Sequence, residues 1–234
     1  MFINWTKIFL LTVIILNDSN FGQSYLELFP KESEKANRFF VEYKEDFEKA
    51  GKNVGLSAEF LYAIVAPELS QYGYLSNKME TYALKVMYVQ GGTAYANFSI
   101  GFFQMKPSFI EQLETFLVTK GYEELKKEFS HCLFIDSDSR QARVERVDRL
   151  NNIEWQMKYL TLFCAIVNKR FGAISFANEE ERLRFYASAY NSGFHKTERQ
   201  IKEMETKAFF PRVSTEKFNY SDVAVGFYNE VIIN

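Results

Sequence analysis

A carboxyl group at an apolar position is the first candidate for chemistry in this sequence. Glu68 lies on the same predicted helical face as a set of apolar residues, which are Leu61, Ile64, Val65 and Leu69. This spacing turns the Glu68 side chain toward the interior. Partial burial raises the pKa of a carboxyl group, so that it can hold a proton near neutral pH. Glu68 is therefore predicted to serve as a general acid.

Two polar motifs follow Glu68 along the chain. Residues 99–107 read Ser-Ile-Gly-Phe-Phe-Gln-Met-Lys-Pro, and residues 189–193 read Ala-Tyr-Asn-Ser-Gly. In the first motif, glycine permits the close approach of a ligand or a neighbouring backbone, and glutamine offers hydrogen-bond donors and acceptors. In the second, the tyrosine hydroxyl could hydrogen-bond Glu68 or a substrate, and the asparagine could bind an acetamido group. These residue types suit a polar glycan.

Helix signals place all three motifs beside helix ends. Ser57 is a good N-cap for the helix that carries Glu68, and Pro67 removes one of its hydrogen bonds. We expect this helix to bend or end beside Glu68. Pro107 is a favoured first residue for the next helix. The motif at 189–193 would close a later helix, so each motif sits where side chains can face a cleft.

The pattern elsewhere in the chain is also helical. An apolar stripe from about Ser33 ends at Gly51, a residue type common just past a helix end. Asn178 is the expected cap of the helix that leads into 189–193. Further helices are expected at about 79–90, 107–120, 122–129, 141–151, 153–171 and 221–231. We interpret 141–151 as exposed and charged, and 153–171 as a core helix. The predicted fold class is all-α, with room for a small hairpin near 95–103.

The composition indicates one domain without a nucleic-acid partner. The chain has 234 residues, of which 47% are hydrophobic and 17% aromatic, enough for one cooperative core. The formal net charge is -2 and neither end carries a dense block of Lys and Arg. A basic patch for nucleic acid is therefore not indicated.

The N-terminal segment indicates export. Lys7 precedes an apolar run over 8–16, which polar residues and Gly22 follow. This pattern is typical of a secretory signal peptide over 1–22, cleaved near Gly22, which leaves 23–234 as the mature domain. Retention as an uncleaved anchor is the alternative, and would be the chain's contact with a membrane. We expect the protein in the periplasm or cell envelope.

Metal-ligating residues are few. Cys132 and Cys164 could form a disulfide in an oxidising compartment, and two buried thiols fit the sequence equally. The only histidines are His131 and His195, and neither stands in a motif. A zinc site has little to build from, and no metal is expected.

The order of the three motifs resembles that of the soluble lytic transglycosylases, which have a lysozyme-like fold. In that family the first motif supplies a single catalytic Glu, the second a Ser before a Gly-x-x-Gln segment that ends in Pro, and the third an Ala-Tyr-Asn-x-Gly turn facing the cleft. The resemblance covers roughly 57–193. It implies Glu68 as the catalytic residue and a set of substrate-binding residues, which are Ser99, Gly101, Gln104, Tyr190 and Asn191.

The resemblance implies cleavage of the β-1,4 bond between N-acetylmuramic acid and N-acetylglucosamine in peptidoglycan strands, without a metal or organic cofactor. Protonated Glu68 would protonate the glycosidic oxygen, and its carboxylate would then deprotonate the muramoyl C6 hydroxyl, whose attack gives a 1,6-anhydro product. A hydrolytic lysozyme would ordinarily need a second carboxylate. The alternatives are such a hydrolase and an inactive glycan-binding or structural module of the same fold.

The chain departs from the family pattern between its first two motifs. Ser99 stands 31 positions after Glu68, farther than is usual in the family, which implies an inserted helix at about 76–96. Glu80 in this segment could reach the cleft as a second carboxylate, and an exposed helical position is the alternative. Leu69 also stands where the family generally has Ser, and Phe102-Phe103 replaces the commoner Leu-Met.

Overall fold

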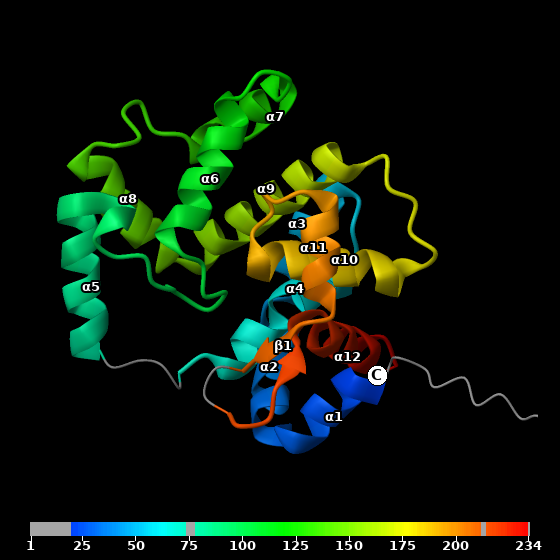
Figure 1. Cartoon of the computed structure of the whole chain (residues 1–234). Helices are drawn as coiled ribbons and strands as arrows, with labels where there is room; N and C mark the ends of the chain where they lie inside the picture. The colour runs from blue at the N-terminus through cyan, green and yellow to red at the C-terminus, as the bar shows by residue number, and fades with distance from the viewer. Residues whose placement is uncertain (1–19, 74–77, 212–213, 234) are drawn as a thin grey trace, which may run out of the picture.

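A computed structural model describes residues 20–73, 78–211 and 214–233, and the all-α fold class is confirmed over these ranges. Most of this part of the chain is helical (Figure 1). The helices are α1 (Asn20–Leu28), α2 (Pro30–Glu42), α3 (Lys44–Val54), α4 (Ala58–Gln71), α5 (Lys78–Gly91), α6 (Pro107–Val118), α7 (Glu123–Glu128), α8 (Arg140–Leu150), α9 (Ile153–Phe171), α10 (Glu179–Ser192), α11 (Glu198–Glu205) and α12 (Tyr220–Ile233). Short 3-10 turns lie at Gly92–Ala94 and Ser130–Cys132.

Helix α4 runs through the centre of the core. Every residue from Phe60 to Ala66 is 0% exposed, because α2, α3, α10 and α12 all pack against this helix (Figure 1). Ser57 caps its start as predicted, since Ser57 Oγ accepts a hydrogen bond from the Phe60 amide at 3.1 Å. A helix that is buried all round holds its later residues, including Glu68, in a fixed position.

Helix α4 continues past Pro67 to Gln71, so it does not end beside Glu68, and the alternative that it bends there stays a prediction. Contacts after the proline hold the last turn in place. Ser70 Oγ donates to the Pro67 carbonyl at 2.7 Å and also lies 2.7 Å from the Tyr25 hydroxyl. These buried hydrogen bonds stabilise a turn that the proline alone would weaken.

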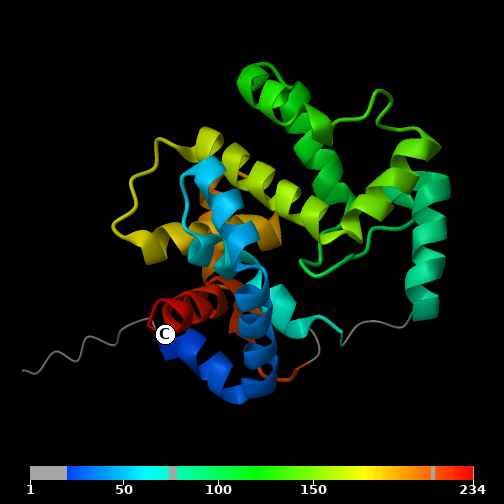
Figure 2. The same cartoon turned by 180° about the vertical axis from the view of Figure 1, so that it is seen from behind.

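Helix α1 was not expected from the sequence, and it packs along α12 (Figures 1 and 2). Tyr25 is fully buried, and its ring meets Phe218 edge-on and Phe227 at a tilt. The predicted signal cleavage beside Gly22 falls inside α1, whereas residues 1–19 lie outside the described ranges. Tyr25 follows that position, so the core contacts of α1 belong to the predicted mature chain.

The predicted helix end at Gly51 is also wrong. Tyr43 separates α2 from α3, and α3 passes through Gly51 to Val54. Gly55, which has φ 67°, is its C-cap. A Cβ on Gly51 would lie 2.3 Å from the Leu56 carbonyl oxygen. The glycine therefore permits a close approach of the following chain rather than a helix end.

The two-stranded sheet lies away from its expected place. Strand β1 (Ala208–Phe210) pairs antiparallel with β2 (Phe218–Asn219), next to α1 and α12. Near 95–103, where the hairpin was expected, the structure has an isolated bridge between Ile100 and Met105. The helices from Ile153 and after Asn178 match the prediction, and Asn178 Oδ1 accepts from the Glu181 amide at 2.8 Å.

Helix α8 is partly buried, which corrects the expectation of an exposed charged helix. Its Arg146 side chain is 1% exposed and binds Glu114 of α6 through Nε to Oε1 at 2.7 Å and Nη2 to Oε2 at 2.6 Å. The Tyr88 hydroxyl of α5 donates to Glu111 at 2.9 Å and accepts from Arg146 at 3.3 Å. We call these four residues the Arg146 cluster. Pairing lets charged residues occupy a buried face.

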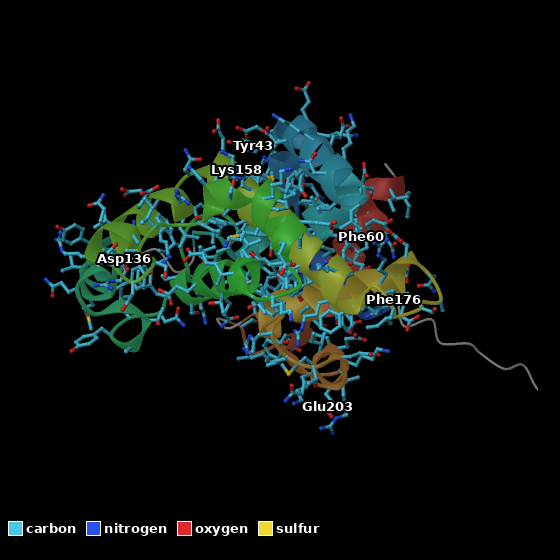
Figure 3. The ribbon with its side chains drawn as sticks, turned by 90° about the horizontal axis from the view of Figure 1, so that it is seen from above. Tyr43, Phe60, Asp136, Lys158, Phe176 and Glu203 are labelled. Atoms are coloured by element: carbon cyan, nitrogen blue, oxygen red, sulfur yellow. The ribbon has the colours of Figure 1, made fainter. Side chains whose placement is uncertain are left out.

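The segment that was predicted to be an insertion contains α5, which stands at the edge of the molecule beside α8 (Figures 1 and 2). Arg143 Nε donates to the Val89 carbonyl at 3.0 Å and joins the two helices. The Glu80 side chain lies outside the part that the structure describes, so its expected reach toward the cleft stays a prediction. Seen from above, Asp136 lies at this same outer end, opposite Phe176 (Figure 3).

Cys132 and Cys164 are buried free thiols, which decides the question that the sequence left open. Burial raises the pKa of both thiols, that of Cys132 to about 12. Thiols with a raised pKa carry little thiolate at neutral pH and serve here as small apolar groups. Within the described ranges, no helix has the length and apolar character needed to cross a membrane.

Candidate functional site

A polar cavity of ≈ 200 Å³ receives side chains from α4, α6 and α10. It brings together all three motifs, although Gly101 is not among the described residues that line it. We call it the Glu68 cavity. Its lining residues are Glu68, Asn97, Ser99, Gln104, Met105, Lys106, Ser108, Phe109, Gln112, Tyr190, Asn191, Ser192, Gly193 and His195.

Glu68 reaches this cavity from a helix whose neighbouring residues are buried. Its own side chain is half-buried, as the apolar spacing predicts, whereas Pro67 and Leu69 are buried. Burial first, and the charge of Glu68 next, raise the pKa of Tyr190 and of Tyr220. The charge of Glu68 therefore acts on both phenol groups, and its half-buried side chain lies at the boundary between the core and the cavity.

Tyr190 joins the third motif to the second. Its hydroxyl donates to the Phe103 carbonyl at 2.7 Å, and its ring meets Phe109 and Phe163 edge-on. A hydroxyl that donates to the backbone can still accept a hydrogen bond, but it has no second hydrogen to donate. Tyr190 therefore holds the 99–107 segment against α10, beside Glu68.

The second motif is a tight turn that presents Ser99 and Gln104 to the cavity. The Ile100 amide donates to the Met105 carbonyl at 2.9 Å, and Gln104 Nε2 donates to the Gly101 carbonyl at 2.7 Å. Gln104 has φ 50°, an uncommon conformation for a residue other than glycine. Such a conformation persists when surrounding contacts enforce it, and it is commonest at functional sites. Pro107 begins α6 as predicted.

Gly101 meets a neighbouring backbone, one of the two approaches expected for it, and its substrate contact stays a prediction. It has φ 73°, and a Cβ there would lie 2.3 Å from both Gln156 Nε2 and the Leu150 carbonyl oxygen. Gln156 Oε1 accepts from the Phe103 amide at 2.8 Å. The missing side chain thus lets the turn dock on α8 and α9, which fixes the wall of the cavity.

Phe102 and Phe103 pack the same turn against aromatic residues of other helices. Phe103 is 0% exposed and packs against Phe39 and Phe47. Phe102 packs between Phe39 and Tyr72, at ring-centroid distances of 5.0 and 4.7 Å. These aromatic contacts connect the turn to α2, α3 and the end of α4.

The third motif ends α10 at the cavity. Asn191 lines the wall, and the Gly193 amide donates to the Ala189 carbonyl at 3.0 Å. Gly193 has φ 115°, a conformation that a side chain would strain. A Cβ there would also lie 2.7 Å from Cε1 of His195, so the imidazole ring rests over the glycine.

Sequence reasoning missed His195 and Gln112 as site residues. His195 Nδ1 donates to Gln112 Oε1 at 2.8 Å. Burial, together with the charges of Lys196 and Arg170, lowers the pKa of His195, so the imidazole is neutral at neutral pH. Two signals could have found the pair. Gln112 is four positions after Ser108 on one helical face, and His195 comes two positions after the last motif residue.

No family model, curated protein or solved structure matches the chain. Among the residues that the structure describes, there is no group of three or more His, Cys, Asp and Glu side chains that could hold a metal ion.

Proposed function

We propose that the protein is an exported peptidoglycan lytic transglycosylase in which Glu68 serves as both acid and base. One observation carries the proposal. Glu68 lines a single cavity with Ser99, Gln104, Tyr190 and Asn191, which come from motifs far apart in the chain. A half-buried carboxyl group among converging polar side chains is a typical arrangement for acid–base chemistry.

The reaction needs one proton carrier. Protonated Glu68 donates its proton to the glycosidic oxygen, and the bond from that oxygen to C1 of the muramoyl residue breaks. The Glu68 carboxylate then takes the proton of the muramoyl C6 hydroxyl, and the C6 oxygen bonds to C1. The products are a free 4-hydroxyl on the leaving sugar and a 1,6-anhydro ring. Glu68 ends protonated, ready for the next cycle.

The lining of the cavity favours this reaction over hydrolysis. Among the described residues that line it, Glu68 is the one carboxylic acid. Hydrolytic glycosidases ordinarily place a second carboxylate at the cleavage point, as base or nucleophile. An intramolecular hydroxyl nucleophile has a high effective concentration and does not need to be held by a second acid.

Amide side chains in the cavity suit the acetamido groups of the substrate. Asn191 and Gln104 each carry a carbonyl acceptor and an NH₂ donor. The edge of Phe109 adds an apolar surface beside Tyr190. A binding site with few polar groups on a partly apolar wall orients a sugar ring without requiring a net charge.

The proposal is tested by incubating the full chain and Glu68→Gln with purified peptidoglycan and identifying the soluble products by mass. Wild type should release 1,6-anhydro-muropeptides, and Glu68→Gln should release them at least ~10²-fold more slowly. Glu59→Gln is the matched control, because Glu59 lies in the first turn of the same helix and outside the cavity lining.

Three results would contradict the proposal in different ways. Equal release by Glu68→Gln would exclude Glu68 as the acid. Products with hydrated reducing ends would indicate a hydrolase, and Glu80→Gln would then be the next variant to assay. Peptidoglycan binding by wild type without any release would indicate a binding module that lacks chemistry.

A further inference from the structure

A hydrogen bond joins two residues that line the Glu68 cavity. Gln112 lies on α6, and His195 lies in the segment between α10 and α11. Both residues line the cavity, and His195 Nδ1 donates to Gln112 Oε1 at 2.8 Å. The two residues are 83 positions apart in the chain. The contact therefore joins two separately placed elements, and we call it the Gln112–His195 bridge.

Gln112 lies farther along α6 than the turn that carries Ser99 and Gln104. Glu68 shares the cavity with Ser99 and Gln104 of the turn that precedes α6, and with Tyr190, whose hydroxyl donates to the Phe103 carbonyl. Gln112 is five residues beyond Pro107, which is about 7 Å farther along the helix axis at 1.5 Å per residue. The bridge thus bounds the cavity on the side away from the start of α6.

The backbone on both sides of His195 is held in place. The ring rests over Gly193, where there is no room for a Cβ. Phe194 is 0% exposed, and its carbonyl accepts a hydrogen bond from Arg170 of α9. Thr197 then forms a capping box at the start of α11. The His195 side chain itself is exposed, so the bridge lies at the solvent-facing rim of the cavity.

We propose that the Gln112–His195 bridge closes one end of the Glu68 cavity and limits the number of sugar units that bind on that side of Glu68. This inference rests on the proposed function. A strand that cannot continue past the bridge must place its end there. The enzyme then removes short units from the ends of glycan strands instead of cutting within them, and Gln112 and His195 determine that specificity.

A binding experiment tests the bridge without using catalysis. Chitin oligosaccharides of increasing length are titrated into Glu68→Gln, and into the same protein with His195→Ala, Gln112→Ala or both. In Glu68→Gln, where the bridge is intact, affinity should stop rising at a shorter oligosaccharide length than in the variants that lack the bridge. Removing the bridge should extend that length, and the longest oligosaccharides should bind about tenfold more tightly, as expected for one or two added hydrogen bonds.

The double variant distinguishes a bridge from two independent wall residues. Either single change breaks the same hydrogen bond, so the double variant should match the single variants. His131→Ala is the control, since the other histidine lies outside the cavity lining. An unchanged length limit in every variant would overturn the inference, as would additive effects of the two single changes.

A turnover experiment separates this inference from the proposed function. With Glu68 intact, wild type should shorten long strands from their ends, and His195→Ala should produce internal fragments. Internal fragments from wild type would overturn the bridge and leave the proposed function standing. If wild type makes no anhydro-products, the proposed function fails, and the binding series still decides whether the bridge limits chain length. Absence of any oligosaccharide binding would overturn both.

Discussion

Glu68 and Glu114 are two acids set among buried residues, and their surroundings differ. Glu114 is 5% exposed and is held by two short hydrogen bonds from Arg146. Glu68 is half-buried and faces a cavity whose other lining residues are mostly uncharged and polar. The more deeply buried acid is a structural ion pair, so burial alone does not identify a catalytic acid. The neighbours of a carboxyl group decide its role.

The pKa directions in the Arg146 cluster follow from the same contacts. Burial raises the pKa of Glu114, although the hydrogen bonds and charge of Arg146 oppose this effect. Burial lowers the pKa of Arg146, and the hydrogen bonds and charge of Glu114 outweigh that and raise it. The two hydrogen bonds between Arg146 and Glu114 join α8 to α6, so the pair contributes to packing rather than to proton transfer.

The largest expected effect is the difference in the free energy of unfolding that is lost when Glu114 or Glu68 is replaced. Glu114→Ala removes both short hydrogen bonds of the buried Arg146 charge and leaves it the more distant Glu111 at 3.8 Å, which should lower the free energy of unfolding by about 3–5 kcal/mol. Glu68→Ala should change it by about 1 kcal/mol or less, because that side chain faces a cavity. Urea unfolding of the two variants measures the difference. Equal losses would mean that Glu68 is also a structural acid.

A double variant sharpens the interpretation of that result. Glu114→Leu with Arg146→Met replaces both buried charges by apolar side chains, and the carboxylate that loses Arg146, Glu111, is partly exposed to solvent. It should recover most of the stability that Glu114→Ala loses, since apolar replacements of buried ion pairs are often neutral. A double variant as unstable as Glu114→Ala would show that the other contacts of Arg146, including its hydrogen bond with Tyr88, carry the stability.

The next effect concerns the wall of the Glu68 cavity. Gly101→Ala would place a Cβ 2.3 Å from the Leu150 carbonyl oxygen at φ 73°, and should lower the free energy of unfolding by about 3 kcal/mol. Gly55→Ala is the matched control, because Gly55 has φ 67° and a Cβ there would meet no other atom within 4 Å. The control should lose about 1 kcal/mol. Similar thermal unfolding of both variants would exclude the proposed close packing of the turn.

The smallest effect uses a third acid, Glu205. Burial raises the pKa of Glu205 to about 7, against the opposing charges of Lys202 and Arg184. The folded chain therefore keeps a proton on Glu205 that the unfolded chain releases above its ordinary pKa, so stability should fall as pH rises from about 4.5 to 7. After allowance for solvent screening the loss should be roughly 1–2 kcal/mol. Urea unfolding across this range should show it in wild type and not in Glu205→Gln. Identical profiles of stability against pH in wild type and Glu205→Gln would contradict the raised pKa of Glu205.

Local signals predicted much of the helical structure. Ser57 and Asn178 cap their helices with the expected hydrogen bonds, and Pro107 is the first residue of α6. These features depend on residues three or four positions apart, which the sequence displays directly. Gly51 was misinterpreted because its constraint comes from Leu56, whose approach depends on packing. The backbone approach allowed for at Gly101 comes from Leu150, which no local pattern could identify. The charged pattern of α8 likewise concealed a buried face whose partners lie on α5 and α6.

The sequence by itself determined which residues could do chemistry. It identified an acid on an apolar helical face and two polar motifs beside helix ends, because residue type and local spacing are enough to define them. Only the tertiary structure decided that Glu68, Gln104 and Asn191 share one cavity, and that Gln112 and His195 meet in its lining. Contacts between residues that are 83 positions apart arise from the packing of α6 and α10 on the core, and no local pattern encodes that distance.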